Sequence, residues 1–575
     1  MHQPSTEPRR SLYYRYRVFP AFQPSSTLQR QGERRKVVIV GAGPIGLAAA
    51  LDLARFGVPC VVLESERQVC DGSRAIVFTR RSLEILQQIG VAERICEKGL
   101  PWRFGNSFYR GERVFRLEAP YDEDDRFFPM INLQQQYVED YLVGAISREP
   151  RIELRWGNRV TGLAQNDAGV GLDVDTPAGP YRMDADWVIA ADGARSTVRQ
   201  LLGLKMEGDA YEGRFVIADI RIDIDLPTER LAFFDPSWNP GNTVLMHRQP
   251  GDLWRIDYQL PPGEEPEQAL APESLRARIA AQLDMIGMGH LPWELDWSSV
   301  YSARAMTLPQ YVHGRVAFTG DSAHLLPIFG VRGANTGWQD SNNLAWKLAC
   351  VVNGWSSPSL LETYSRERVT AAREIIDEAG KSTRFMTPPT RGFRLLRDAT
   401  LSLSLQHAFV RPLFHWRTSR PHEYLDSTLN AGDDDDGLFR AGPVKGAAVP
   451  NIRLGQHRHL LDRFGPAFQF LHFTEGGEVP AAIRNTIASL RTIGMPLQVI
   501  AIRNQGEGSV YGADVTVTDA SGHAWQKYGV ESPGAAYLVR PDQHVCARWL
   551  APTPARLAAA FHRALAHDTA AVPAP

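Results

Sequence analysis

The chain has 575 residues and a formal net charge of −2; 43% of the residues are hydrophobic and 22% are charged. This composition is typical of a globular protein of two to four domains, and the near-neutral charge gives no general attraction to nucleic acid or anionic membranes. No apolar stretch is long enough to span a bilayer. Five scattered cysteines, without metal-ligand spacing or a Cys-x-x-Cys motif, predict reduced thiols, no metal site and a cytoplasmic location.

Residues 1–35 differ in composition from the rest: they are rich in arginine, serine and proline and lack the apolar core of a secretory signal. An organelle transit peptide stays an alternative, because the segment is poor in acidic residues. We expect instead an N-terminal arm whose aromatic side chains pack on the domain that follows. These side chains are Tyr13, Tyr14, Tyr16 and Phe19.

A nucleotide-binding unit begins at residue 36. Residues 36–40 predict a buried strand, the glycine loop 41–46 follows it, and a helix and a second strand then lead to Glu64. Glu64 lies 18 positions after Gly46 (64 − 46), close to the roughly 20 expected for an acid that binds a ribose. In this context of strand, loop, helix and strand, the Gly-x-Gly-x-x-Gly pattern predicts a dinucleotide site.

Further polar residues stand where they could reach the same ligand. Arg74 lies between the second strand and a helix expected over residues 79–89, so we interpret it as a cofactor contact rather than a surface cation. Gln135 precedes an amphipathic helix expected over residues 137–146, whose start could bring an amide to the ligand. Asp192 and Gly193 end another buried strand and precede a basic helix.

The central motif runs from Gly320 to Lys347. A strand over residues 315–319 delivers Asp321 to its carboxyl end, and a glycine-rich loop then feeds a helix that starts at Gly333. Backbone N–H groups at a helix N-terminus can hold an electron-rich or anionic group, and glycines let a flat ligand approach the main chain. The motif therefore suits a cofactor ring.

Other patterns divide the chain. Alternating runs between residues 211 and 305 predict antiparallel strands that could roof a pocket, residues 359–385 predict a long helix, and four aspartates at 433–436 predict a solvated linker. The predicted parts are the arm (1–35), the nucleotide-binding domain (36–210 and 306–432, the latter with a helical segment), the sheet domain (211–305) and a separate α/β domain (440–575).

Three signatures in chain order carry a resemblance: the glycine loop with Glu64, then Asp192-Gly193, then Gly320-Asp321. Together they resemble the single-component FAD-dependent aromatic hydroxylases of the para-hydroxybenzoate hydroxylase superfamily. The fuller match is to 3-(3-hydroxyphenyl)propionate hydroxylase-like and phenol hydroxylase-like members with a thioredoxin-like C-terminal domain. The implied fold class is α/β: a Rossmann-like FAD-binding domain, an interleaved antiparallel-sheet substrate domain and a thioredoxin-like domain.

The resemblance also implies a non-covalent FAD, with NAD(P)H as a co-substrate that uses a surface groove and leaves after hydride transfer. Asp321 would bind the ribityl chain, and Pro327 with the start of the following helix would line the isoalloxazine. The full set of implied cofactor-binding residues is Gly41, Gly43, Pro44, Gly46, Glu64, Arg74, Gln135, Asp192, Gly193, Asp321, Pro327, Gly333, Ala334 and Asn335.

The implied reaction is hydroxylation of a phenolic or related aromatic substrate with O2 through a flavin C4a-hydroperoxide. Candidates for the base that activates the phenol are Asp71, His247 and Tyr258, each against an ordinary structural role. His324 is interpreted as a structural hydrogen-bonding residue. A reductase or oxidase without oxygen insertion and a silent flavoprotein binding subunit stay alternatives. The substrate, the choice of NADH or NADPH and a homodimeric state are left open by the sequence.

Overall fold

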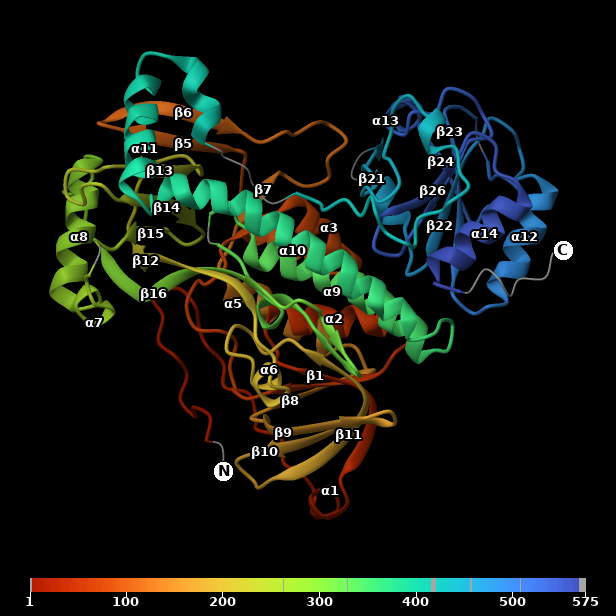
Figure 1. The fold of residues 1–575 in the computed structure, drawn as a ribbon, viewed down its shortest axis with the longest axis horizontal. Helices are drawn as coiled ribbons and strands as arrows, with labels where there is room; N and C mark the ends of the chain where they lie inside the picture. The colour runs from red at the N-terminus through yellow and green to blue at the C-terminus, as the bar shows by residue number, and fades with distance from the viewer. Residues whose placement is uncertain are drawn as a thin grey trace.

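A computed structural model describes residues 3–261, 263–327, 329–414, 420–455, 458–506 and 508–567. In Figure 1, three bodies surround the long helices α9 (Gly333–Val352) and α10 (Ser359–Met386): a mainly parallel sheet below them, an antiparallel sheet to the left and a C-terminal domain to the right. The protein is thus a mixed α/β chain in which segments distant in sequence build the two larger sheets, while the C-terminal domain comes from one continuous stretch.

The parallel sheet follows the order β17-β18-β11-β1-β2-β8, and β9 and β10 extend it beyond β11. Parallel pairing joins β1 to both β2 and β11, and β11 to β18. The central strands end in buried apolar runs, as expected for strands covered on both faces. The strands are β1 (Glu33–Val40), β2 (Cys60–Glu64), β8 (Ile152–Trp156), β9 (Arg159–Asn166), β10 (Gly169–Asp175), β11 (Tyr181–Ala190), β17 (Val312–His313) and β18 (Val316–Phe318).

Helix α2 (Pro44–Arg55) packs closely against α9 because glycines lie at the contact. A Cβ added to Gly337 would lie 2.8 Å from Ile45 Cδ1, and one added to Gly320 would lie 3.2 Å from Ile45 Cγ1. Ile45 belongs to the first turn of α2. The start of α2 is therefore held against the segments that carry the Gly320-Asp321 motif.

The second sheet has eight strands in the order β19-β16-β12-β15-β14-β13-β5-β6. Its first six strands come from residues 207–325, but β5 and β6 form a hairpin from residues 104–118, and β5 pairs in parallel with β13. The sequence alone places this hairpin with the nucleotide-binding domain. The strands are β5 (Phe104–Tyr109), β6 (Glu112–Glu118), β12 (Glu207–Arg221), β13 (Arg230–Phe234), β14 (Thr243–Gln249), β15 (Leu253–Gln259), β16 (Glu294–Thr307) and β19 (His324–Leu325).

The two faces of this sheet have different neighbours. Its outer face packs against α8 (Pro272–Met285) through an apolar cluster that includes Trp254, Ile256 and Leu283. Its inner face contacts the loop after β19, because the rings of Phe215 and Phe329 meet edge to face at 5.4 Å. The inner face therefore roofs the central motif.

The C-terminal domain is a five-stranded sheet in the order β24-β23-β22-β25-β26, in which the first three strands are parallel and β25 and β26 run antiparallel to their neighbours. Its assignment as thioredoxin-like stays a prediction. Its elements are β22 (Phe468–Phe473), α12 (Ala481–Arg491), β23 (Leu497–Arg503), β24 (Val515–Thr518), α13 (His523–Lys527), β25 (Ala536–Val539), β26 (Val545–Trp549) and α14 (Pro554–Ala564).

The remaining elements lie within these bodies or between them. They are α1 (Ser26–Gln31), β3 (Val77–Thr79), α3 (Arg80–Gln88), α4 (Ala92–Lys98), β4 (Leu100–Trp102), β7 (Met130–Asn132), α5 (Gln135–Ile146), α6 (Thr197–Leu201), α7 (Pro266–Ala269), η1 (Gly320–Ser322), α11 (Arg391–Ser404), η2 (Ala408–Phe414), η3 (Asp436–Leu438), β20 (Arg453–Gly455), β21 (Arg458–His459) and η4 (Leu460–Arg463).

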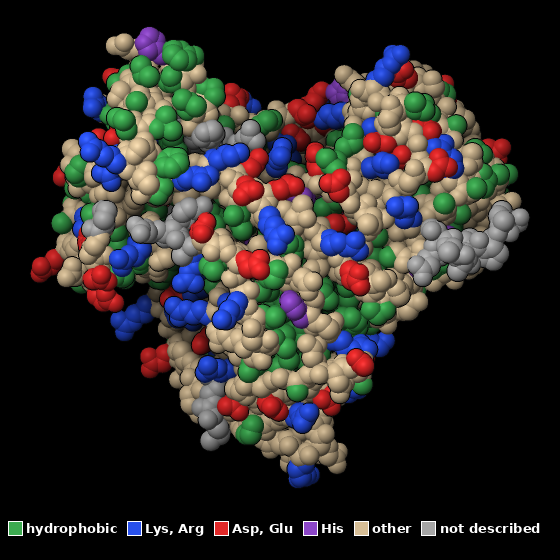
Figure 2. Space-filling model, viewed as in Figure 1, with side chains coloured by type: hydrophobic (Ala, Val, Ile, Leu, Met, Phe, Trp, Pro, Cys, Tyr) green, Lys and Arg blue, Asp and Glu red, His purple; other side chains and the backbone are tan. Residues whose placement is uncertain are grey.

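Figure 2 shows apolar side chains gathered over α11, where Leu395 is 71% exposed.

The acidic segment 433–436 is not a freely solvated linker. Asp434 pairs with Lys445, and Asp436 accepts a hydrogen bond from Arg548 Nε at 2.6 Å. Arg556 pairs with Asp435 at 2.8 Å. These cations belong to the C-terminal domain or its approach, so opposite charge docks the segment onto that domain.

Among the described residues, no helix is long and apolar enough to cross a membrane, and no cluster of His, Cys, Asp and Glu side chains suits a metal ion.

A buried ion cluster joins the C-terminal domain to the long helices. Glu367 of α10 accepts hydrogen bonds from Lys347 of α9 at 2.7 Å and from Arg540 Nη1 at 2.7 Å, and Arg540 also pairs with Asp542. Burial alone would raise the pKa of Glu367, but Arg540 and Lys347 hold it well below its usual range. Arg540 follows β25, so a side chain of the C-terminal domain neutralises an acid of the central helix.

We expect Arg540→Ala to destabilise the protein by about 3–5 kcal/mol, because two buried carboxylates would lose their shared counter-charge. Denaturant unfolding at pH 7 measures this. The control is Arg440→Ala, which removes an exposed pair with Glu531 (side chains 85% and 66% exposed) and should cost less than about 1 kcal/mol. Equal losses in the two variants would contradict the role given to Arg540.

Candidate active site

The register of the parallel sheet brings three separate motifs to one edge. Val40 of β1 is the neighbour of Ala190 of β11, which is the neighbour of Phe318 of β18. The residues that follow these strands leave the same carboxyl edge, where ligands of open α/β sheets bind. Gly41, Asp192 and Gly320 are therefore neighbours in space although they span most of the first 320 residues.

The three glycines of the first loop differ in what surrounds them. A Cβ on Gly41, whose φ is +104°, would lie 2.5 Å from the Ala191 carbonyl oxygen, and one on Gly46 would lie 2.1 Å from the Gly41 carbonyl oxygen. A Cβ on Gly43 would meet nothing within 4 Å. Gly43 caps α2 and Pro44 is its first residue. The outer glycines thus allow close packing, while Gly43 leaves an open face before a helix N-terminus.

Glu64 lies beside this loop at the end of β2. Its Oε2 accepts a hydrogen bond from the Ala42 amide at 2.8 Å, and its Oε1 accepts one from the Glu66 amide at 2.8 Å. Burial raises the pKa of Glu64, although these two bonds lower it. Glu64 therefore braces the glycine loop as well as standing at the position expected of a ribose ligand.

The Arg74 loop is held by two neighbouring elements. Arg255 of β15 donates from Nη1 to the carbonyls of Ser73 at 2.7 Å and Arg74 at 2.8 Å. Gln135 at the start of α5 accepts from the Ala75 amide at 3.0 Å. The Arg74 side chain itself is exposed, and its charge opposes the effect of burial, which raises the pKa of Asp321. Arg74 thus faces the central motif from across the edge of the sheet.

The Gly320-Asp321 turn rests on a buried charged network. Asp340 of α9 accepts hydrogen bonds from His324 Nε2 at 2.6 Å, Arg368 Nε at 2.6 Å and the Gly320 amide at 3.1 Å. The side chains of Asp340, His324 and Arg368 have no exposure to solvent. Burial alone would raise the pKa of Asp340, but His324 and Arg368 hold it below its usual range. His324 therefore anchors the turn.

Asp321 itself is exposed to solvent, unlike the members of this network. The surrounding protein still raises its pKa by desolvation, against the opposing charges of His324 and Arg74. Tyr301 of β16 is a further neighbour: its hydroxyl donates to the Leu326 carbonyl at 3.2 Å, and burial together with the Asp321 charge raises its pKa. Asp321 thus has Tyr301 of the antiparallel sheet and the loop that carries Arg74 as neighbours.

The Asp192-Gly193 segment joins the same edge. Asp192 Oδ2 accepts from the Val198 amide at 3.1 Å, and burial raises the Asp192 pKa. A Cβ on Gly193, whose φ is +77°, would meet nothing within 4 Å. Arg199 of α6 donates to the Ser322 carbonyl at 3.0 Å, which ties this segment to the Gly320-Asp321 turn.

Helix α9 begins at Gly333, where an added Cβ would again meet nothing within 4 Å. The Asn335 side chain is fully engaged: its Oδ1 accepts from the Thr79 amide at 2.9 Å and its Nδ2 donates to the Val331 carbonyl at 2.7 Å. The Asn335 side chain is therefore committed to the protein, and at this residue the main chain is what can serve a ligand. Before this helix, Pro327 is buried and Val331 is a β-branched residue at φ +55°.

These observations fit FAD. Gly43, Gly193 and Gly333 each leave open space where a side chain would stand, and two helix N-termini, those of α2 and α9, follow the first and third of them. One N-terminus suits a pyrophosphate and the other an electron-rich ring. The edge thus offers separate places for the two ends of a long dinucleotide.

A polar row crosses the inner face of the antiparallel sheet. Strand register aligns Asp219 of β12, Arg255 of β15, His247 of β14 and Arg230 of β13. All four residues are buried, with 2–7% exposed. Burial, together with Arg230 and Arg255, lowers the pKa of His247 well below its usual range, so the imidazole is neutral at physiological pH. Within the part of the chain that the structure describes, His247 Nδ1 and both amide atoms of Gln249 have no hydrogen-bond partner.

The three predicted base candidates do not come together. Tyr258 lies on the outer face, where its ring meets Trp238 at 5.6 Å and Arg278 lies 5.6 Å from its centroid. Asp71 is half-buried near Asp296, whose pKa is raised by burial and, to a smaller extent, by the Asp71 charge. Of the three, His247 alone lies on the inner face of the antiparallel sheet. This face covers the carboxyl edge of the parallel sheet where the three cofactor motifs meet, which we call the cofactor edge. Sequence reasoning missed Asp219, Arg230, Arg255 and Asp257, although the alternation in 253–259 puts Arg255 and Asp257 on one side.

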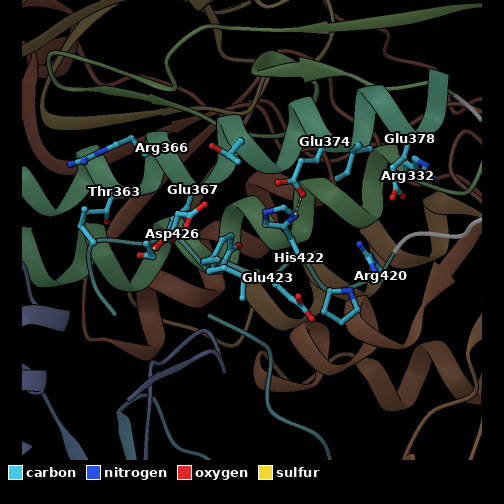
Figure 3. A pocket seen from close by; sticks show the side chains of 17 residues that line it. Arg332, Thr363, Arg366, Glu367, Glu374, Glu378, Arg420, His422, Glu423 and Asp426 are labelled. Carbon is cyan, nitrogen blue, oxygen red and sulfur yellow. Dashed lines mark hydrogen bonds and ion pairs between the residues drawn. The ribbon is translucent and has the colours of Figure 1, made fainter. Parts of the chain in front are cut away.

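A cavity of about 440 Å³ lies elsewhere, between α10 and residues 420–428, and none of the predicted site residues lines it. Figure 3 shows charged side chains around it, with His422 paired to Glu374 at 3.5 Å. Burial, with Arg368 and His544 nearby, lowers the pKa of His422 to about 3. Arg332, which caps α9, is one of the residues that line this cavity.

Comparison with known proteins agrees with this geometry. The family model described as FAD binding domain matches residues 34–379, more than half of the chain. The chain belongs to this family. A Burkholderia vietnamiensis protein named 3-(3-hydroxy-phenyl)propionate/3-hydroxycinnamic acid hydroxylase 2 is 31% identical over 545 residues, which are 92% of this chain and 96% of that protein. A similarly named Mycobacterium avium hydroxylase is 27% identical over 556 residues, 92% of each chain.

Solved structures show the same fold. The flavin-dependent monooxygenase PieE, solved with FAD and substrate, is 24% identical with a TM-score of 0.76 and covers 92% of this chain and 99% of its own. Aklavinone-11 hydroxylase, solved with FAD and aklavinone, is 24% identical with a TM-score of 0.74, covering 93% and 99%. This member of the FAD-binding family thus combines the nucleotide-binding and antiparallel sheets in the arrangement of flavin-dependent hydroxylases, and its cofactor is FAD.

We expect Gly43→Ala to leave the stability of the apoprotein unchanged within about 0.5 kcal/mol but to weaken FAD binding, because the new methyl enters only the open face. Gly46→Ala should lower both, because its Cβ would overlap the Gly41 carbonyl oxygen. Thermal unfolding and flavin retention after gel filtration measure these effects. Full FAD retention in Gly43→Ala would show that the pyrophosphate does not pass this residue.

We also expect Asp219→Asn to stabilise the protein more at pH 8 than at pH 5. Burial raises the pKa of Asp219 to about 7, Asp257 and Asp296 add to this, and Arg255 and the Ser73 hydroxyl oppose it. The carboxyl group's contribution to stability is therefore present below pH 4 and lost as the pH rises through about 7. Melting temperatures of variant and wild type at both pH values measure the difference; Asp225→Asn, at an exposed site, should show no such gain.

Proposed function

We propose that the protein hydroxylates a phenolic ring, with FAD as its bound cofactor and NAD(P)H and O2 as co-substrates. The observation that carries this proposal is the neutral, buried His247 on the sheet face that roofs the cofactor edge; its Nδ1 has no hydrogen-bond partner among the described residues. The names of the similar hydroxylases support it. As the first substrate class we propose hydroxyphenyl propanoic and cinnamic acids, which the similar proteins are named for.

The bound FAD would supply the redox chemistry, which is hydride uptake from NAD(P)H and activation of O2. The residues proposed to hold it are those of the three motifs, with Gly43 and Pro44 at the pyrophosphate, Glu64 at the ribose and Asp321 at the ribityl chain. The main-chain N–H groups at the start of α9 would stabilise negative charge on the ring.

The sheet supplies the remaining tasks. Its inner face covers the cofactor edge and excludes water, which strengthens electrostatic interactions in the site. His247 can accept the hydrogen bond of a phenol hydroxyl, because its imidazole is neutral. Arg230 and Arg255 give the same row positive charge, which attracts a phenolate or carboxylate. Tyr258 faces the opposite side of the sheet, so the geometry favours His247 over it as the base.

Homodimer formation, a cytoplasmic location and the domain limits of 36–210, 211–305, 306–432 and 440–575 belong to this proposal. All five cysteines are free thiols in the structure, which supports a reducing compartment. The hairpin of β5 and β6 is the exception within these limits, because it pairs with the substrate sheet.

We expect purified protein to be yellow, and its NAD(P)H oxidation to accelerate with 3-(3-hydroxyphenyl)propionate or 3-hydroxycinnamate. Mass spectrometry should find one added oxygen in the product. His247→Gln should lower the hydroxylation rate by roughly 10²-fold or more, while His290→Gln, at an exposed site, should not change it.

Two results would contradict this proposal in different ways. Oxidation that yields only hydrogen peroxide across a panel of phenols would remove hydroxylation but leave the flavin. Normal hydroxylation in His247→Gln would remove the assigned base but leave the reaction.

A further inference from the structure

The N-terminal arm runs along the segment that leads to Arg74. Arg9 donates from Nη1 to the Val69 carbonyl at 2.6 Å, and its amide donates to Gln68 Oε1 at 3.0 Å. Farther along, the Phe19 amide donates to the Arg67 carbonyl at 2.8 Å, and Arg67 Nε donates back to the Phe19 carbonyl at 2.8 Å. The arm is therefore bonded to residues 67–69 from both ends.

Between these contacts, Tyr16 reaches the turn at Gly72. Its hydroxyl donates to the Cys70 carbonyl at 3.1 Å and accepts from the Gly72 amide at 3.3 Å, and Tyr16 is only 6% exposed. Gly72 has a φ of +69°, and a Cβ there would lie 2.2 Å from the Trp297 ring. The turn is thus enclosed between the arm and the roof sheet.

The other anchors of this loop lie at its ends. The Cys70 amide donates to Glu139 at 2.6 Å, and the Ala75 amide donates to Gln135 at 3.0 Å, both on α5. Arg255 holds the carbonyls just before Ala75. The hydroxyl of Tyr16 accepts the hydrogen bond of the Gly72 amide at the middle of the loop, two residues before Arg74.

The match to the FAD-binding family starts at residue 34, so the arm lies outside the part that the family model describes. We propose that the arm, through the Tyr16 hydroxyl, positions the 70–75 loop so that Arg74 meets the FAD. Tyr16 acts through the loop and is a positioning residue. The proposal rests on the proposed place of Arg74 at the cofactor. The loss of such a hydroxyl should loosen FAD binding by about 2-fold to 10-fold.

The test uses the full-length variant Tyr16→Phe with Tyr14→Phe as its matched control. Tyr14 packs against Tyr16 at 4.8 Å and against Tyr137 at 5.1 Å, but within the described residues its hydroxyl has no hydrogen bond. Two measurements are made on each: amide hydrogen exchange of residues 70–75 in the apoprotein, and FAD affinity by fluorescence titration. We expect Tyr16→Phe to speed exchange at Gly72 and to weaken FAD binding, while Tyr14→Phe matches the wild type in both.

Wild-type exchange and affinity in Tyr16→Phe would overturn the inference, as would equal changes in both variants. Arg74→Ala separates it from the proposed function. If Arg74→Ala binds FAD as tightly as the wild type, then the placement of Arg74 at the cofactor is wrong and the inference falls with it. If Arg74→Ala weakens binding and Tyr16→Phe does not, only the role of the arm is overturned.

Discussion

The buried carboxylate of Asp340 is the interaction on which the cofactor edge depends. It accepts hydrogen bonds from the turn before Asp321, from His324 and from Arg368 of α10. Taking these charges out of water is costly, and the cost is offset only when every member is paired. Arg368 also donates a hydrogen bond from Nη1 to the Tyr424 hydroxyl at 3.0 Å. The position of Asp321 and the start of α9 are consequently set by the packing of the long helices.

Local motifs were readable from the sequence because each combines a strand end with a specific residue type. The glycine loop, Asp192 and Asp321 stand out in this way, and α10 extends over Ser359–Met386 much as the periodicity of 359–385 predicts. The register that brings the three motifs together could not be read, because strands β1, β11 and β18 are far apart in the chain. Pairing between distant strands leaves no local signal, and the β5 and β6 hairpin was missed for the same reason.

The sheet face that roofs the site shows a second limit. Strand alternation separates Trp254, Ile256 and Tyr258 from Arg255 and Asp257, but it cannot say which side is covered by the nucleotide-binding domain. Charged residues in a strand suggest a solvated face, whereas here the charged side is buried against the Arg74 loop. Similarly, the aspartates at 433–436 suggest solvent, and instead they meet cations that become neighbours only in the folded chain.

The joint at Glu367 bears on why the chain keeps a C-terminal domain without a redox motif. The counter-charges of this one acid come from two domains, since Lys347 belongs to α9 and Arg540 follows β25 of the C-terminal domain. Without the domain, the Glu367 carboxylate would lose its partner Arg540 and would lie, with the Lys347 ammonium group, beside newly exposed apolar surface. The C-terminal domain therefore has a structural role in the chain that requires no catalytic activity of its own.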